Sequence, residues 1–503
     1  MRGIAGTGRR ITFGVLVAVA LAAAPAGAAT SASGLYVVGA GNGHGVGMSQ
    51  YGAAGYALHG ARYEEILRDY YAGTTLGHID PQRIVTVLLQ SGAPAVLVTG
   101  ATTIPGARTV RGAKLKLDPL WHYRITAAGD GLRVSLGRRP IGRFPAPLRM
   151  SGPGPLTAGG LGAFRGDLVF RPTPGGGVMT VNALGLDDYV RGVVSAEMPS
   201  SWPTQALEAQ AVASRTYALT TRPAGPDFDL YATPTSQLYE GVRGETPAGD
   251  AAVTATSGQV VEYAGAPVQT LFFSSSGGAT ESAQNVFSLS PAAWLVGRPD
   301  PYDDVLGNPY HRWERSFSLD QAQQRLGRLV DGSLVGIEVL EHGVSPRIVR
   351  ARVVGTTGSV AVSGDQLRQL FGTPSTWMSF TTVTSRGVIT HRPGGGTTTG
   401  SGTTPEPTRS SSGGGGLAGG TGQAASQRGA AGHRGPAGEA VSGTIFPGPA
   451  GARVTVERLG ARGWAPAAAG RLTAGGHYVV PVRAAGEYRV RYGVVDGPAI
   501  TVG

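Results

Sequence analysis

The sequence predicts a strand-rich α+β protein, for three reasons. Short apolar or alternating runs, punctuated by Gly and Pro, fill residues 85–180, and similar runs return between residues 453 and 502. Two other segments, Tyr63 to Tyr71 and Thr204 to Thr220, carry apolar residues at three- and four-residue intervals. A period of two indicates strands, and a period near 3.6 indicates helices. A chain of 503 residues has room for two or three folded units.

The N-terminus has the features of a secretory signal peptide. A cationic start that contains Arg9-Arg10 precedes an apolar run from Ile11 to Ala24, and small residues follow. This run is shorter than the ~20 residues that a membrane span needs. We therefore expect residues 1–29 to be removed near Ala28-Ala29, which predicts a secreted or cell-wall protein without a stable membrane span. Both the Sec and the twin-arginine export routes stay open.

Residues 33–390 form the predicted main domain. Its strand-like runs include the apolar stretch Thr86 to Leu89 and the alternating stretch Leu132 to Leu136. Its second helical segment follows Pro203, a residue type that is favoured at helix entries. Strands outnumber helices in this domain, which gives the α+β class.

Composition divides the rest of the chain in two. Between residues 391 and 440, 16 of 50 residues are Gly and none is Val, Ile or aromatic, which predicts a flexible linker. Residues 441–503 alternate again between turns, as in a small antiparallel β-sandwich. Trp464 and the run Gly486 to Val490 resemble small Ig-like modules of exported bacterial proteins. We interpret this tail as an adhesive or spacer module, because it holds no catalytic constellation.

Charge and cysteine content limit the kinds of site and of partner that the chain can have. The chain has no cysteine, which excludes disulfides, thiolate metal sites and cysteine nucleophiles. Its formal net charge of +11 suits an anionic partner such as a wall polymer or a lipid headgroup. Nucleic acid is the competing partner, but the arginines are scattered and no recognition motif is present. We expect no nucleic-acid partner.

The first segment that carries chemistry runs from Gly41 to Thr74. Its opening places several glycines around His44, and dense glycine permits tight turns and close approach by another chain or a sugar. The alternative is a Gly-rich corner around a buried histidine. The segment lacks the Lys-Ser/Thr of a phosphate loop, and its histidines show no metal-ligand spacing.

The second segment runs from Leu186 to Thr220 and contains Glu197, followed by Trp202 and a proline. A carboxyl group beside tryptophan and proline is partly desolvated, which raises its pKa and suits a general acid for glycoside cleavage. Arg215 lies one helix later and could orient either the substrate or Glu197. In the alternative, Glu197 caps the following helix and Arg215 pairs with Asp187 or Asp188 on a solvated face.

Both segments resemble the signatures of the SpoIID/LytB family, and the resemblance covers roughly residues 35–380. The strings that carry it are GHGVGMSQYGA from Gly43, Leu186-Asp187-Asp188-Tyr189, Glu197-Met198-Pro199, Arg215-Thr216-Tyr217, Ser274-Ser275-Ser276-Gly277-Gly278 and Thr280-Glu281.

The resemblance implies a SpoIID-type catalytic domain that acts as a lytic transglycosylase on the glycan strands of peptidoglycan. The family's catalytic glutamate corresponds to Glu197, and Arg215 corresponds to a cleft arginine. Glu197 would protonate the glycosidic oxygen and then act as base while the muramyl C6 hydroxyl closes an anhydro ring. We assign Ser275, Tyr239 and the loop from His44 to Gln50 to the wall of the cleft. The sporulation members of the family also suggest a role in sporulation.

Two departures from the family pattern matter. The GHGVGMSQYGA segment usually closes the domain, but here residues 41–74 open it, which indicates a circular permutation. This predicts that Leu35 to Val38 packs beside the chain near Phe380, because those pieces are contiguous in the usual order.

Some relatives also carry a Cys-containing metal site, where this chain has Ser236-Gln237-Leu238-Tyr239. We therefore predict no zinc, no other metal and no cofactor.

Three functions remain open from the sequence. The first is a lytic transglycosylase that cleaves MurNAc-GlcNAc bonds. The second is a non-catalytic, peptidoglycan-binding enhancer whose partner is a cell-wall amidase or another wall protein. The third, a purely structural wall protein, would leave both signatures unused.

Overall fold

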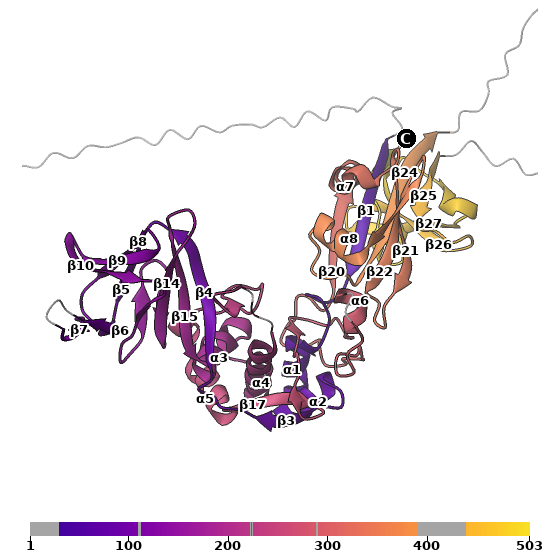
Figure 1. The fold of residues 1–503 in the computed structure, drawn as a ribbon. Coiled ribbons are helices and arrows are strands. Elements are labelled where there is room, and N and C mark those ends of the chain that lie inside the picture. Colours follow the sequence, from indigo (N-terminus) through magenta and orange to yellow (C-terminus); the bar gives the residue numbers. More distant parts are fainter. Residues whose placement is uncertain (1–29, 109–111, 222, 224, 288–289, 390–438) are drawn as a thin grey trace, which may run out of the picture. The chain divides into compact units, whose positions relative to one another are not determined.

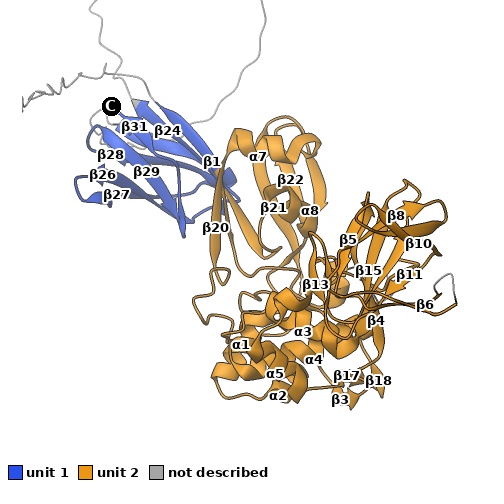
Figure 2. Cartoon of the chain, turned by 90° about the vertical axis from the view of Figure 1, so that its left-hand side faces the viewer, with its two compact units in different colours: residues 1–34, 382–503 blue, residues 35–381 orange. Residues whose placement is uncertain are grey.

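The computed structural model describes residues 30–108, 112–221, 223, 225–287, 290–389 and 439–503. The predicted signal peptide and most of the predicted linker, residues 391–438, lie outside this range. The chain divides into two compact units: one holds residues up to 34 and from 382 onward, and the other holds residues 35–381 (Figure 2). No helix in the described ranges is long and apolar enough to cross a membrane.

The strand-rich α+β class is confirmed. The strands expected between residues 85 and 180 form two sheets of the larger unit. Both sheets are antiparallel, except that β16 pairs in parallel with β4 at the edge of the first sheet. In spatial order the first sheet is β11 (Leu148–Met150), β14 (Asp167–Pro172), β15 (Val178–Gly185), β4 (Ile84–Ala93) and β16 (Leu230–Tyr231). The second is β10 (Arg139–Pro145), β9 (Gly131–Leu136), β8 (Tyr123–Ala128), β5 (Val96–Thr99), β12 (Leu156–Ala158) and β13 (Gly162–Phe164).

A layer of helices lies next to these sheets and shares one hydrophobic core with them (Figure 1). Its centre is α4 (Thr204–Thr220), the predicted second helix, most of whose residues are buried. An Ala-rich sequence permits this, because small side chains let neighbouring helices approach on every side. The helices packed around α4 are α1 (Gln50–Leu58), α2 (Tyr63–Tyr70), α3 (Leu186–Glu197) and α5 (Pro247–Ala255).

Short elements complete this layer. A three-stranded sheet lies beside α4 and consists of β18 (Ala266–Pro267), β17 (Gln259–Tyr263) and β3 (Thr75–His78). The others are β2 (Met48–Ser49), η1 (Gly241–Gly244), β19 (Phe272–Phe273) and α6 (Ala283–Phe287). Outside this layer, β6 (Thr103–Arg108) and β7 (Lys114–Lys116) form a two-stranded sheet, and β6 contacts β11.

A second hydrophobic core of the larger unit joins the two ends of the predicted main domain. There β1 (Ser31–Gly39) lies between β20 (Trp313–Ser318) and β24 (Met378–Ile389), as Figure 1 shows. Leu35, Val37 and Phe380 are buried in this core, and Ser379 Oγ donates to the carbonyl of Val38 at 3.4 Å. The predicted packing of Leu35 to Val38 near Phe380 is confirmed, whereas the circular permutation itself stays a prediction.

The same core is covered by two helices and a three-stranded sheet. These elements are α7 (Leu319–Leu326), η2 (Gly327–Leu329), β21 (Leu334–His342), β22 (Ile348–Gly355), β23 (Ser359–Ser363) and α8 (Gly364–Phe371).

In its described residues, the smaller unit contains strands and one 3-10 turn. The predicted boundaries at residues 390 and 441 differ from it, because β24 runs on into this unit and pairs there with β25, which begins at Glu439. Its remaining elements are β25 (Glu439–Phe446), β26 (Arg453–Gly460), β27 (Gly463–Arg471), η3 (Ala474–Gly476), β28 (His477–Val482), β29 (Gly486–Tyr492), β30 (Val495–Asp496) and β31 (Ile500–Val502). The Ig-like topology stays a prediction.

Candidate active site

The larger unit contains a cavity of about 440 Å³ that brings together segments far apart in the sequence. Four segments contribute to it: the Gly-rich loop, the end of α3, the turn before Gln237 and the region of β19. The loop reaches this place because β2 pairs in parallel with β19, with Met48 opposite Phe272. The lining residues are Gly43, His44, Gln50, Glu197, Tyr217, Pro234, Thr235, Ser236, Leu271, Phe272, Phe273, Ser274 and Phe287.

Glu197 is the last residue of α3, and it lines this cavity. The Leu238 N–H donates to Glu197 Oε1 at 2.6 Å. Burial raises the pKa of Glu197, and the hydrogen bonds from Leu238 and Gln50 oppose that rise without cancelling it. The negative end of the helix dipole acts in the same direction as burial. Part of this carboxyl group therefore stays protonated closer to neutral pH than an exposed glutamate does.

The cause of this burial differs from the one that the sequence suggested. Trp202 does not line the cavity; its ring packs on Tyr51 with centroids 4.7 Å apart. The apolar surface beside Glu197 comes instead from rings that lie far away in the sequence, namely Tyr217, Phe272, Phe273 and Phe287.

Gln50 links the Gly-rich loop to the end of α3. It is the first residue of α1, and Ser49 caps that helix by accepting a hydrogen bond from the Gly52 N–H at 3.1 Å. Gln50 Nε2 donates to the backbone carbonyl of Glu197 at 3.2 Å and to Gln210 Oε1 at 3.4 Å. The start of α1 and the end of α3 are thus held together at the cavity.

His44 is held as a neutral ring. Its Nδ1 accepts a hydrogen bond from the Val46 N–H at 3.1 Å, so Nε2 carries the proton and donates to the Phe272 carbonyl at 3.1 Å. Burial, and next the charge of Arg347, lower the pKa of His44 to about 4. Gly45 has a positive φ of 90°, and a Cβ there would lie 2.4 Å from Arg347 Nε, which explains the glycine.

The buried carboxylate of Asp303, which the sequence did not single out, supports the Gly-rich loop through hydrogen bonds. Asp303 is fully buried and accepts hydrogen bonds from Ser49 Oγ at 2.9 Å and from Ser275 Oγ at 2.8 Å. It also accepts from the backbone N–H groups of Ser276 and Gly277 and from Asn308 Nδ2. Ser275 therefore faces Asp303, and its neighbour Ser274 is the one that lines the cavity.

Arg215 and Tyr239 lie behind the cavity. The Arg215 side chain is 0% exposed, and its Nε contacts Asp187 Oδ1 at 2.6 Å. The pairing with Asp187 matches one alternative from the sequence, but the pair is buried and not solvated. Tyr239 is 4% exposed and donates its hydroxyl to Asn182 Oδ1 at 2.6 Å. The structure thus brings Glu197, His44 and Gln50 together, but not Arg215, Ser275 or Tyr239.

Within the described ranges, no three side chains of His, Cys, Asp or Glu are grouped so that they could hold a metal ion. The segment Ser236 to Tyr239 contributes Ser236 to the cavity wall and the Leu238 N–H to Glu197.

Comparisons with known proteins agree on one family. Residues 174–263 match SpoIID, described as stage II sporulation protein. The chain is 28% identical over 233 residues to stage II sporulation protein D of Bacillus subtilis (strain 168), which is 41% of this chain and 65% of that protein. It is 38% identical over 133 residues to the amidase enhancer of the same organism, which is 26% of this chain and 17% of that protein. An uncharacterized protein of Brachyspira hyodysenteriae is 37% identical over 130 residues, 25% of this chain and 35% of that one. Each match spans less than two thirds of the relative's own length.

The resemblance to the SpoIID/LytB family is confirmed. The segment that matches SpoIID contains Glu197, Arg215 and Tyr239, whereas His44, Gln50 and Ser275 lie outside it. The cavity is lined by residues of the matched segment and by residues that precede and follow it in the sequence. The Gly-rich loop, which precedes the segment, supplies part of the cavity wall.

Proposed function

We propose that this chain is an exported peptidoglycan lytic transglycosylase that cleaves MurNAc-GlcNAc bonds and leaves anhydromuramyl ends. The observation that supports this most is the single carboxyl group among the lining residues of the cavity, that of Glu197. Inverting and retaining glycoside hydrolases usually need two carboxyl groups, one to act as acid and one to activate water or attack the sugar. One carboxyl group suffices when the nucleophile belongs to the substrate itself.

In the proposed reaction, protonated Glu197 donates its proton to the glycosidic oxygen as the bond to the muramyl C1 breaks. The departing sugar leaves with a free hydroxyl group. The muramyl C6 hydroxyl attacks C1, and the Glu197 carboxylate accepts the proton that this oxygen loses. The glutamate returns to its protonated state, and no water is consumed.

The rest of the cavity suits a sugar substrate. The rings of Phe272, Phe287 and Tyr217 offer apolar faces against which the C–H faces of pyranoses can pack. Thr235, Ser236 and Ser274 add hydroxyl groups that can donate to or accept from sugar hydroxyls. His44 Nε2 is already engaged by Phe272, so we assign this residue to shaping the wall and not to proton transfer.

Export and action at the cell wall are part of the proposal. The pattern of residues 1–29 supports export, and the relatives named stage II sporulation protein D and amidase enhancer support a role at the wall.

A second candidate function is stimulation of a cell-wall amidase by glycan binding without cleavage. The 38% identity to a protein named amidase enhancer favours it. In that case Glu197 would hold the cavity together through Leu238 and take no part in chemistry.

The two functions are separated by incubating the mature chain with purified glycan strands and searching the products for anhydromuramyl ends by mass spectrometry. We expect such ends from the parent chain and none from the Glu197→Gln variant. Glu314→Gln changes an exposed glutamate on β20 and serves as the matched control. Equal product from the parent chain and Glu197→Gln would refute the proposed role of Glu197. No product from either, with amidase stimulation intact in both, would establish the second function.

A further inference from the structure

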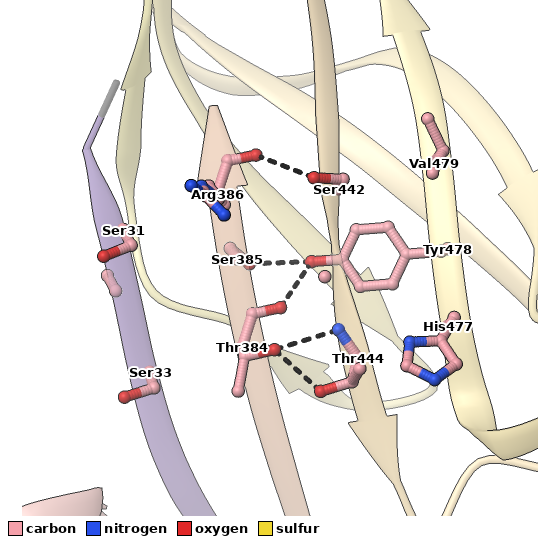
Figure 3. Close-up of a pocket in the computed structure, with 12 residues that line it drawn as sticks. Ser31, Ser33, Thr384, Ser385, Arg386, Ser442, Thr444, His477, Tyr478 and Val479 are labelled. Atoms are coloured by element: carbon pink, nitrogen blue, oxygen red, sulfur yellow. Dashed lines mark hydrogen bonds between the residues drawn. The ribbon is translucent and has the colours of Figure 1, made fainter. Parts of the chain in front are cut away.

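The smaller unit has a cavity of its own, of about 510 Å³. Four neighbouring strands, β1, β24, β25 and β28, supply its wall (Figure 3). The volume lies within the ~300–1,000 Å³ range of small-molecule sites. No catalytic residue has been assigned to this part of the chain.

The strand register places two rows of side chains across this surface. In one row Thr384 lies opposite Thr444, which lies opposite His477. In the other row Arg386 lies opposite Ser442, which lies opposite Val479. Residues directly opposite one another in antiparallel strands point to the same face, so each row crosses three strands on one side of the sheet.

A third row of residues lies between these two rows and supports the wall through hydrogen bonds. Ser385, Gly443 and Tyr478 form the intervening row, and Ser385 and Tyr478 are buried. The Tyr478 hydroxyl lies 2.8 Å from Ser385 Oγ and donates to the Thr384 carbonyl at 2.8 Å. Gly443 makes room for this ring, because a Cβ there would lie 2.6 Å from the Tyr478 hydroxyl.

The wall is rich in short hydroxyl side chains. Ser31 and Ser33 of β1 add two to those of Thr384, Ser442 and Thr444, as Figure 3 shows. The Thr384 and Thr444 hydroxyl groups hydrogen-bond to each other at 2.7 Å, and Ser442 Oγ donates to the Arg386 carbonyl at 3.5 Å. Whichever threonine donates, Thr444 Oγ1 and Ser442 Oγ each keep a lone pair that can accept a hydrogen bond from a sugar hydroxyl. Val479, which is 68% exposed, adds an apolar surface for a sugar C–H face.

The charge of the wall favours an anion. The lining residues include Arg386 and His477 but neither Asp nor Glu. Within the described ranges, the Arg386 guanidinium forms no ion pair and no hydrogen bond. An unpaired guanidinium beside a row of hydroxyl groups is suited to a carboxylate, which it can bind with two parallel hydrogen bonds.

We propose that this cavity is a second glycan-binding site, which holds a peptidoglycan strand through its pyranose hydroxyls and a muramyl lactyl carboxylate. The site takes the same polymer as the proposed function but uses no residue of the Glu197 cavity. It would anchor the chain on the strand that the larger unit processes.

The test measures binding of purified denuded glycan strands to the full mature chain in a Glu197→Gln background, so that no strand is cut. Arg386→Gln removes the guanidinium, and Ser442→Tyr fills the cavity. We expect each to weaken binding about tenfold, the scale of one charge-assisted hydrogen-bonding pair. Arg453→Gln, on the exposed start of β26, is the matched control and should bind within about twofold of the background chain.

Circular dichroism and melting temperature identify any variant that fails to fold, and Arg386→Gln is the variant that leaves packing intact. Unchanged binding in both folded cavity variants would overturn the proposal. Chitin oligomers, which lack the lactyl group, should bind more weakly and be insensitive to Arg386→Gln. Equal binding of chitin, or a loss confined to a phosphate-bearing wall polymer, would refute the lactyl carboxylate.

The two proposals can fail separately. On a short soluble glycan fragment, the parent chain should release anhydromuramyl ends whether or not the second site binds the strand. Absence of those ends in the parent chain would refute the proposed function and leave the binding result standing.

Discussion

The Leu238 backbone N–H and the Glu197 carboxyl oxygen Oε1 lie 2.6 Å apart, so the segment from Ser236 to Tyr239 holds the candidate acid in place. This bond fixes one oxygen, while burial keeps the pKa of the group raised.

Replacing Glu197 by Gln should abolish glycan cleavage while the protein stays folded. The amide keeps the shape of the side chain and the hydrogen bond from Leu238 but cannot donate and recover a proton. Loss of a general acid typically reduces the rate by about 10²–10⁴-fold. Initial rates of anhydromuramyl formation measure this, and a reduction below about tenfold would contradict the assignment.

The same substitution should change how stability depends on pH. Burial raises the folded-state pKa of Glu197 above its unfolded value. Its contribution to stability is therefore complete below the unfolded pKa and is lost as the pH rises through the folded pKa. Because the amide does not ionise, Glu197→Gln should gain stability relative to the parent as the pH rises from the ordinary pKa of a glutamate through the raised pKa of Glu197. Melting temperatures of both proteins across this range provide the check, and a difference independent of pH would contradict it.

The rate of cleavage should follow the same titration. Since the acid must be protonated when the substrate binds, kcat/KM should fall as the pH rises through the raised pKa of Glu197. A rate that is flat over that interval would mean that another group supplies the proton.

Asp303→Ala should destabilise the larger unit strongly. The substitution leaves Ser49 Oγ, Ser275 Oγ and two backbone N–H groups without their buried acceptor. Leaving buried donors unpaired costs about 1–3 kcal/mol each before relaxation, so we expect a loss of about 3 kcal/mol or more in the free energy of unfolding. Asp304→Ala, at a side chain that is 74% exposed, is the matched control for denaturant titration. Equal stability of the two variants would contradict the role given to Asp303.

Arg215→Ala tests whether this arginine supports the fold or contacts substrate. Removing one member of a buried ion pair costs about 3–5 kcal/mol, because the other charge stays buried and unpaired. We expect that loss of stability here, since the Arg215 side chain is 0% exposed beside Asp187. Arg243→Ala, on a side chain that is 75% exposed, should change little. A variant of parental stability with a raised KM would instead support the cleft role that the family resemblance implied.

The sequence predicts two helices of the larger unit, α2 and α4, and the strand-rich stretch between residues 85 and 180, because their periodicity is local. The helix from Thr204 to Thr220 has the predicted bounds, and the buried residues of α2 are Ile66, Leu67 and Tyr70, which have helical spacing. The helix α3 (Leu186–Glu197) was not predicted, and its Val193-Val194 pair is more typical of a strand. The compact unit that contains β25 to β31 begins at residue 382, whereas composition suggests a boundary at residue 390, because composition marks linkers and not strands. Nothing in the composition of β24 shows that this single strand passes from one unit into the other at residue 382.

The candidate site was predictable only in part. Glu197, His44 and Gln50 stand in distinctive strings, and the structure brings them to one cavity. Asp303 stands in no such string, and its importance comes from partners that only the folded chain assembles around it. Arg215 was placed in the cleft by resemblance, although its buried partner Asp187 lies in a string that the sequence had already marked.

The most direct test of the account is to run the reaction in water enriched in ¹⁸O and weigh the glycan products. The account predicts muramyl ends that carry no ¹⁸O and are lighter by one water than hydrolysed ends, because the C6 hydroxyl and not solvent attacks C1. Muramyl reducing ends that contain ¹⁸O would show hydrolysis and contradict the proposed mechanism.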